Sequence, residues 1–130
     1  MTTETPQDLR TRTTEFALRI VRLYTSLPKT TEAQVLGKQV LRSGTSVGAN
    51  YREGHRAKSD PDIVNKFESV LQELDETDFW LDLLVRANIV SAQKVGPLIK
   101  ETNELIAIFT TIVTKIVTTQ VCFSELLPKL

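Results

Sequence analysis

The chain has 130 residues, enough for one domain with a substantial core, and its 41% hydrophobic and 25% charged residues are ordinary for a globular protein. Its formal net charge is zero, but residues 1–58 hold ten Lys/Arg against five Asp/Glu (+5), and residues 59–130 hold six against eleven (−5). No apolar run reaches the roughly 20 residues that span a bilayer, and no signal-peptide pattern opens the chain. The single cysteine, Cys122, excludes an intrachain disulfide. We therefore expect a cytoplasmic protein.

The first helix is predicted over about residues 6–27. Thr5 followed by Pro6 is typical of a helix start, and Pro28 ends the segment. Apolar residues recur between these limits at alternating spacings of four and three, which marks one buried helical face. This stripe consists of Leu9, Thr13, Phe16, Ile20, Leu23 and Leu27.

The second helix is predicted over about residues 31–56, with its start near Thr30-Thr31-Glu32. Glycine inside a helix costs about 0.5–1 kcal/mol relative to alanine, so the three glycines at positions 44, 48 and 54 suggest close approach to a neighbouring helix. The alternative is a helix broken by a loop near residues 43–48. The expected inward positions are Leu36, Val40, Gly44, Val47, Tyr51 and Gly54.

The third helix is predicted over about residues 60–87, after the N-cap pattern Ser59-Asp60-Pro61-Asp62, and Asn88 is expected to end it. Phe79 and Leu83 lie opposite its stripe and beside Trp80. We therefore expect a second buried face here, formed in a homo-oligomer through Phe79, Trp80 and Leu83. The stripe itself is Ile63, Phe67, Val70, Leu74, Thr77, Leu81 and Leu84.

The fourth helix is predicted over about residues 92–120, with Gly96-Pro97 in its first turns or at its true start. Together the segments predict an all-α protein, an antiparallel up-down-up-down four-helix bundle in one domain over residues 1–130. The inward stripe of the last helix is Val95, Leu98, Thr102, Leu105, Phe109, Ile112 and Ile116.

The sequence offers little for catalysis or cofactor binding. One histidine and one cysteine cannot supply a usual metal site, and no inward Glu-x-x-His pairs occur. No nucleophile elbow, phosphate-binding loop or dinucleotide fingerprint is present. We expect no catalytic residues, no metal and no cofactor.

A basic cluster at the end of the second helix is the main candidate for binding. Cations around Tyr51 could combine phosphate contact with base stacking. The alternative is a solvated helix end whose cations complement the C-terminal carbonyls. The candidate nucleic-acid-binding residues are Arg42, Arg52, Arg56 and Lys58, near His55, with Arg12, Arg19 and Arg22 as second candidates.

The antiparallel turn near residues 57–59 also predicts a register between the second and third helices. Arg42 should lie level with Glu73–Glu76, and Lys38 with Asp78, so that ion pairs connect the two helices. Asn50, near the edge of the stripe, should hydrogen-bond a neighbouring group or, alternatively, a ligand.

The chain resembles the bacterial four-helix-bundle family of proteins encoded in intervening sequences of 23S rRNA genes. The resemblance is densest at residues 41–54 (LRSGTSVGANYREG) and 75–84 (DETDFWLDLL). The family pattern is a small-residue helix ending in Ser-hydrophobic-x-x-Asn-x-x-Glu-Gly, followed by an acidic helix with aromatic residues. Ser46, Val47, Asn50, Glu53 and Gly54 stand at those positions.

This resemblance implies a ring-shaped homopentamer without established enzymatic activity. It also implies kinship to the accessory protein of diversity-generating retroelements, a basic pentamer that binds reverse transcriptase and nucleic acid. The zero net charge of this chain departs from that basic protein. We therefore expect a non-enzymatic homo-oligomer that binds RNA or a nucleic-acid-binding protein, or alternatively a protein-interaction scaffold with no nucleic-acid role.

Overall fold

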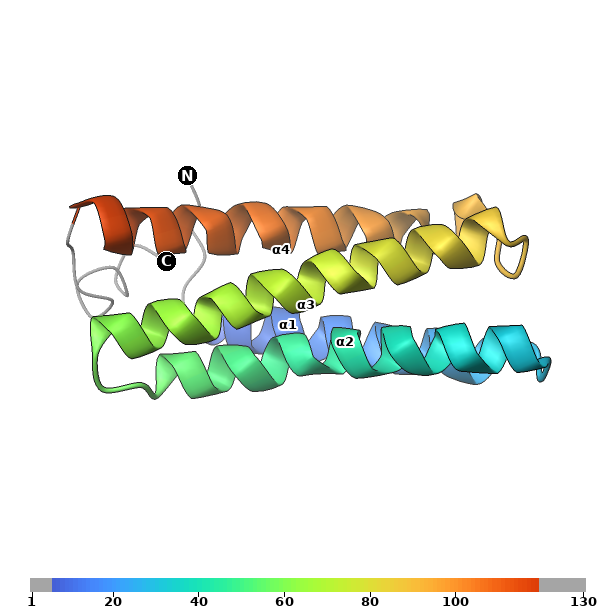
Figure 1. Ribbon diagram of the computed structural model, residues 1–130, viewed down its shortest axis with the longest axis horizontal. Helices are drawn as coiled ribbons and strands as arrows, with labels where there is room; N and C mark the ends of the chain where they lie inside the picture. The colour runs from blue at the N-terminus through green and yellow to red at the C-terminus, as the bar shows by residue number, and fades with distance from the viewer. Residues whose placement is uncertain (1–5, 120–130) are drawn as a thin grey trace.

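The computed structural model describes residues 6–119 and contains four long helices. These are α1 (Pro6–Ser26), α2 (Thr31–His55), α3 (Asp60–Arg86) and α4 (Ala92–Thr119). Each helix runs back along the one before it, as Figure 1 shows, so the described chain forms an antiparallel four-helix bundle. Every helix end lies at or within one residue of its predicted position. Thr5, expected before the first helix, and Cys122 lie outside the described residues.

Hydroxyl side chains start three of the helices. Thr30, in an extended conformation, accepts the backbone N–H of Ala33 at 3.4 Å before α2. Ser59 accepts the N–H of Asp62 at 3.3 Å before α3, and Ser91 accepts that of Lys94 at 3.1 Å at the start of α4. Each oxygen satisfies one of the amides that a helix N-terminus leaves without an intrahelical acceptor.

The core lies along the bundle axis and is built by the predicted stripes. All stripe residues of α1, α3 and α4 are buried, and so are those of α2 except Leu36, which is half-buried. Four core positions carry hydroxyls, at Thr13, Ser43, Thr77 and Thr102. Two of them join helices: Ser43 and Thr77 share a hydrogen bond of 2.8 Å, and Thr77 also donates to the Glu73 carbonyl at 2.8 Å. This buried pair is satisfied and fixes the register of α2 against α3.

Glycines allow α2 to approach its neighbours closely. A Cβ built on Gly44 would lie 2.6 Å from Ile20 Cγ1 of α1, and one on Gly54 would lie 2.5 Å from Phe67 Cε1 of α3. Such separations are too short for a methyl group, so only glycine fits unless the neighbour moves. Helix α2 is continuous through both residues, which excludes a loop at residues 43–48.

Asn88 ends α3 in a left-handed conformation, with φ at 60°. Ile89 N–H donates to the Leu84 carbonyl at 3.0 Å, and Asn88 N–H donates to that of Val85 at 3.0 Å. These two bonds form a Schellman motif, in which the residue at the left-handed position is usually glycine or asparagine.

We expect Asn88→Ala to lower the free energy of unfolding by about 1 kcal/mol, because a Cβ without a local polar group is disfavoured at positive φ. Asn88→Gly should equal or exceed the wild-type stability. Urea unfolding of both variants measures the difference. If Asn88→Ala raised the free energy of unfolding, this would contradict the left-handed conformation of residue 88.

Within the described residues, none of the helices is both long and apolar enough to cross a membrane.

Candidate functional site

The predicted basic cluster lies at the end of the bundle where α2 turns into α3 (Figure 1). Arg56 caps α2, and its N–H donates to the carbonyls of Arg52 and Glu53 at 3.2 Å each. Ala57 N–H donates to the Gly54 carbonyl at 3.1 Å, and Ser59 then starts α3. This tight turn exposes the side chains of Arg56 and Lys58 to solvent.

Tyr51 does not belong to the exposed surface. It is 1% exposed and its ring stacks on Phe67, with centroids 5.8 Å apart and the planes 15° from parallel. Burial raises the pKa of its hydroxyl to about 12, although the positive charge of Arg10 acts in the opposite direction. The hypothesis that Tyr51 stacks on a base is therefore wrong, because its ring is part of the core.

Two of the four candidate cations are held within the bundle. Arg42 Nη2 donates to Glu76 Oε1 at 2.6 Å, and its Nη1 lies 3.5 Å from Glu73 Oε1. The predicted pairing of Arg42 with α3 is confirmed. Arg52 Nη2 reaches α1 and donates to Thr14 Oγ1 at 2.9 Å, a contact that the sequence pattern did not indicate.

The other two candidates, Arg56 and Lys58, have no side-chain partner among the described residues. Arg10, exposed near the start of α1, also makes no ion pair with a described residue and lies close enough to Tyr51 to influence its pKa. The sequence pattern did not single out Arg10, although its place in the first turns of α1 puts it at this end of an up-down bundle. His55 packs its ring against Tyr51, with centroids 5.9 Å apart.

The prediction that Lys38 pairs with Asp78 is wrong. Both residues are described, and no ion pair within 4.0 Å joins them. The pKa of Asp78 is raised, first by burial and then by the negative charges of Asp82 and Asp75. The pKa of Glu73 is also raised, because burial outweighs the attraction of Arg42. Among the described residues, Glu73 Oε1 meets no hydrogen-bond donor in good geometry, and Arg42 approaches it at 3.5 Å as an ion pair.

The second candidate cations, Arg12, Arg19 and Arg22, also include one residue that is ion-paired within the bundle and two that are not. Arg12 of α1 pairs with two carboxylates of α4: its Nε donates to Glu101 Oε2 at 2.7 Å and its Nη2 to Glu104 Oε1 at 2.7 Å. Arg19 and Arg22 make no ion pair with a described residue, and Arg22 is exposed.

Three residues of the family motif, Ser46, Glu53 and Gly54, have structural partners. Ser46 Oγ donates to the Arg42 carbonyl at 2.7 Å, Glu53 accepts Lys66 Nζ of α3 at 2.6 Å, and Gly54 admits the Phe67 ring. Asn50 is half-buried and its amide makes no hydrogen bond to a described residue, so the prediction of a protein partner for Asn50 is wrong. Its partial exposure leaves the amide available to solvent.

The residues predicted to form an oligomer interface lie together on α3. Phe79 is 55% exposed and meets the half-buried Trp80 edge to face, with centroids 4.9 Å apart. Leu83, one turn further, is half-buried. The indole N–H of Trp80 is buried and meets no hydrogen-bond acceptor in the part of the chain that the structure describes. Phe79, Trp80 and Leu83 therefore lie together on one stretch of α3, and the oligomer interface that we expect them to form is a prediction.

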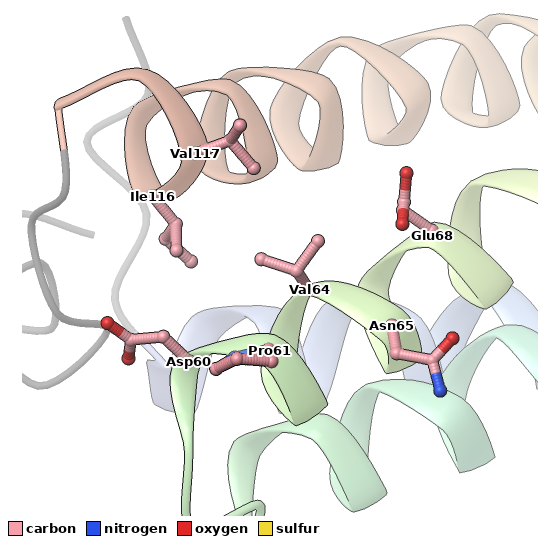
Figure 2. A pocket seen from close by; sticks show the side chains of 7 residues that line it. All are labelled: Asp60, Pro61, Val64, Asn65, Glu68, Ile116 and Val117. Carbon is pink, nitrogen blue, oxygen red and sulfur yellow. The ribbon is translucent and has the colours of Figure 1, made fainter.

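A groove lies between the start of α3 and the end of α4, where Val64, Ile116 and Val117 converge (Figure 2). Its volume is about 370 Å³, and Asp60, Pro61, Asn65 and Glu68 complete its lining. None of the candidate cations borders this groove. Among the described side chains, no group of three or more His, Cys, Asp or Glu residues is placed to hold a metal ion.

Comparison with known proteins identifies one matching family and a similar solved structure. The family model for the 23S rRNA-intervening sequence protein matches residues 7–111. Among solved structures, the chain is similar to a protein of unknown function from the S23 ribosomal protein family of Bacteroides thetaiotaomicron, with 37% identity and a TM-score of 0.76. That similarity covers 81% of this chain and 97% of the other. The curated proteins contain no match.

Proposed function

Because this chain belongs to the family of 23S rRNA-intervening sequence proteins, we propose that it is a non-enzymatic homo-oligomer that binds RNA or a ribonucleoprotein. The oligomer we propose is the pentamer implied by the family resemblance. The family takes its name from an RNA and not from a reaction. The proposed role therefore rests on recognition by surface charge.

The observation that carries this proposal is the exposure of Arg56 and Lys58 at the α2–α3 turn. Neither side chain has a partner among the described residues, whereas Arg42, Arg52 and Arg12 are each held by groups of the same chain. Unpaired surface cations are the groups that contact phosphates and release counterions. In a ring, each copy would repeat the pair at the same end, and their potentials would add.

Binding to a single-stranded and to a structured RNA, followed by fluorescence polarisation, tests the proposal. We expect binding at about 50 mM salt that weakens steeply as salt is added, because phosphate contacts release counterions. Binding that is absent at low salt, or insensitive to salt, contradicts it.

The double variant Arg56→Gln/Lys58→Gln should bind RNA about 10- to 100-fold more weakly at low salt, since it removes two phosphate contacts in every copy. Arg42→Gln is the matched control, because Arg42 is already paired with Glu73 and Glu76. It should change affinity by less than about threefold. If the double variant and Arg42→Gln lost RNA affinity equally, the binding surface would not be the α2–α3 turn.

A protein-interaction scaffold is the second candidate. Zero net charge and the internal pairing of Arg12 and Arg42 both favour it, as does the exposed Phe79. In that case the polarisation experiment would show no RNA binding, while light scattering would still show an oligomer.

A further inference from the structure

The groove between the start of α3 and the end of α4 has an apolar floor that is open to solvent (Figure 2). Val64 of α3 and Ile116 and Val117 of α4 form this floor. Val117 is 58% exposed, the most exposed large hydrophobic residue of the described chain. Exposed apolar groups that adjoin one another in a groove indicate a surface that another segment or a partner covers.

The rim of the groove is acidic. Asp60 and Glu68 are the first and last residues that α3 contributes to the lining, and neither makes an ion pair with a described residue. The volume of about 370 Å³ is at the lower end of the range of about 300–1,000 Å³ that is usual for ligand pockets. The groove therefore suits a few apolar side chains from an occupant without net negative charge.

Residues 120–130 follow α4 in the sequence and lie outside the described residues. Their sequence, QVCFSELLPKL, has the composition that such an occupant needs. One carboxylate, Glu125, is balanced by one cation, Lys129, so the side chains of the segment add no net charge to the acidic rim. The large apolar residues of the segment are Val121, Phe123, Leu126, Leu127 and Leu130.

This segment is attached beside the groove. Val117, on the groove floor, is three residues before Gln120. The lining along α3 runs from Asp60 to Glu68, which at 1.5 Å per residue is about 12 Å of helix. Eleven residues span about 36 Å when extended and about 16 Å when helical, so the segment is long enough in either form. A short covalent connection also gives an effective concentration in the mM range, which favours this segment over a separate partner.

We propose that residues 120–130 turn back at the end of α4 and dock in this groove, with their large apolar side chains on its floor. Lys129 then lies where the carboxylates of the rim attract it. Docking covers Val117 and connects α3 to α4 at the end of the bundle that also carries the α2–α3 turn. Such docking requires neither RNA binding nor self-association.

Cys122 reports the docking, because it is the only cysteine of the chain and stands within the proposed segment. Its reaction with N-ethylmaleimide, an uncharged thiol reagent, is followed by mass spectrometry in native protein and in urea. We expect labelling of the native wild type to be at least about 10-fold slower than that of the unfolded chain, because reaction requires the segment to leave the groove. Val117→Glu in the groove and Leu126→Ser in the segment should each accelerate native labelling at least about fivefold, because each places a polar group in the apolar contact.

Val35→Glu is the matched control and should leave the labelling rate unchanged. Val35 is 56% exposed but lies near the start of α2, at the opposite end of the bundle (Figure 1). Circular dichroism checks that each variant keeps its helices, and Leu126→Ser tests the docking without altering the described bundle. Native labelling as fast as labelling in urea would overturn the docking, and so would protection of Cys122 that persists in Leu126→Ser or in folded Val117→Glu. Protection that disappears on dilution would mean that the segment docks on another copy, which also overturns the proposal.

Discussion

Phe67→Ala should lower the free energy of unfolding by about 3–5 kcal/mol, the largest effect we expect from a single side chain. Phe67 is fully buried, stacks on Tyr51 and meets Phe109 edge to face with centroids 5.4 Å apart. Truncation removes the ring and leaves a cavity between α2, α3 and α4. It also removes two aromatic contacts, each worth about 0.5–1.5 kcal/mol beyond simple burial.

Urea unfolding at two protein concentrations measures this loss and separates it from any contribution of association. Phe67→Leu is the control, since it keeps most of the apolar volume and should cost less than half as much. A loss below about 1 kcal/mol for Phe67→Ala would mean that the aromatic cluster is not the packing centre of this end of the bundle.

Gly54→Ala should destabilise the protein by about 1–3 kcal/mol, although alanine is the better helix former. The added methyl group would meet Phe67 Cε1 at 2.5 Å and Lys66 Cβ at 3.1 Å, so the two helices must separate or the ring must move. Gly48→Ala is the matched control in the same helix. Its methyl group would lie 3.5 Å from Thr13 Oγ1, an ordinary contact, so it should stabilise by about 0.5–1 kcal/mol.

The Phe67→Leu background tests whether Gly54→Ala destabilises the protein through the Phe67 ring. Without the ring edge, Gly54→Ala should cost less than it does in wild type, which a double-mutant cycle reports as a coupling energy. Equal costs in both backgrounds would show that the methyl group does not act through Phe67.

Local sequence chemistry determined most of the fold. Ser59 and Thr30 can cap a helix wherever they precede one, and the four-three stripes fix the face that each helix buries. These signals depend only on neighbours along the chain. The position of Arg42 beside Glu76 along the bundle axis could also be predicted, because it follows from counting residues on either side of the short turn between α2 and α3.

The lateral arrangement of the helices could not be predicted in the same way. The contact of Arg52 with Thr14 and that of Arg12 with Glu101 depend on which helix lies to each side and how far away it is. Lys38 and Asp78 were expected at one level, yet they form no pair, because level alone does not direct two side chains toward each other. In the sequence, Tyr51 belongs both to the apolar stripe and to the basic cluster. Its burial shows that it packs in the core.

The salt dependence of RNA affinity in wild type and in Arg56→Gln/Lys58→Gln tests the central claim most directly. On single-stranded RNA, each neutralised phosphate contributes about 0.7 to the slope of log affinity against log salt. If an oligomer presents Arg56 and Lys58 repeatedly to one RNA, the double variant should reduce the slope by more than about 1.4, the value for two phosphates. An unchanged slope in the double variant would contradict RNA binding through this end of the bundle.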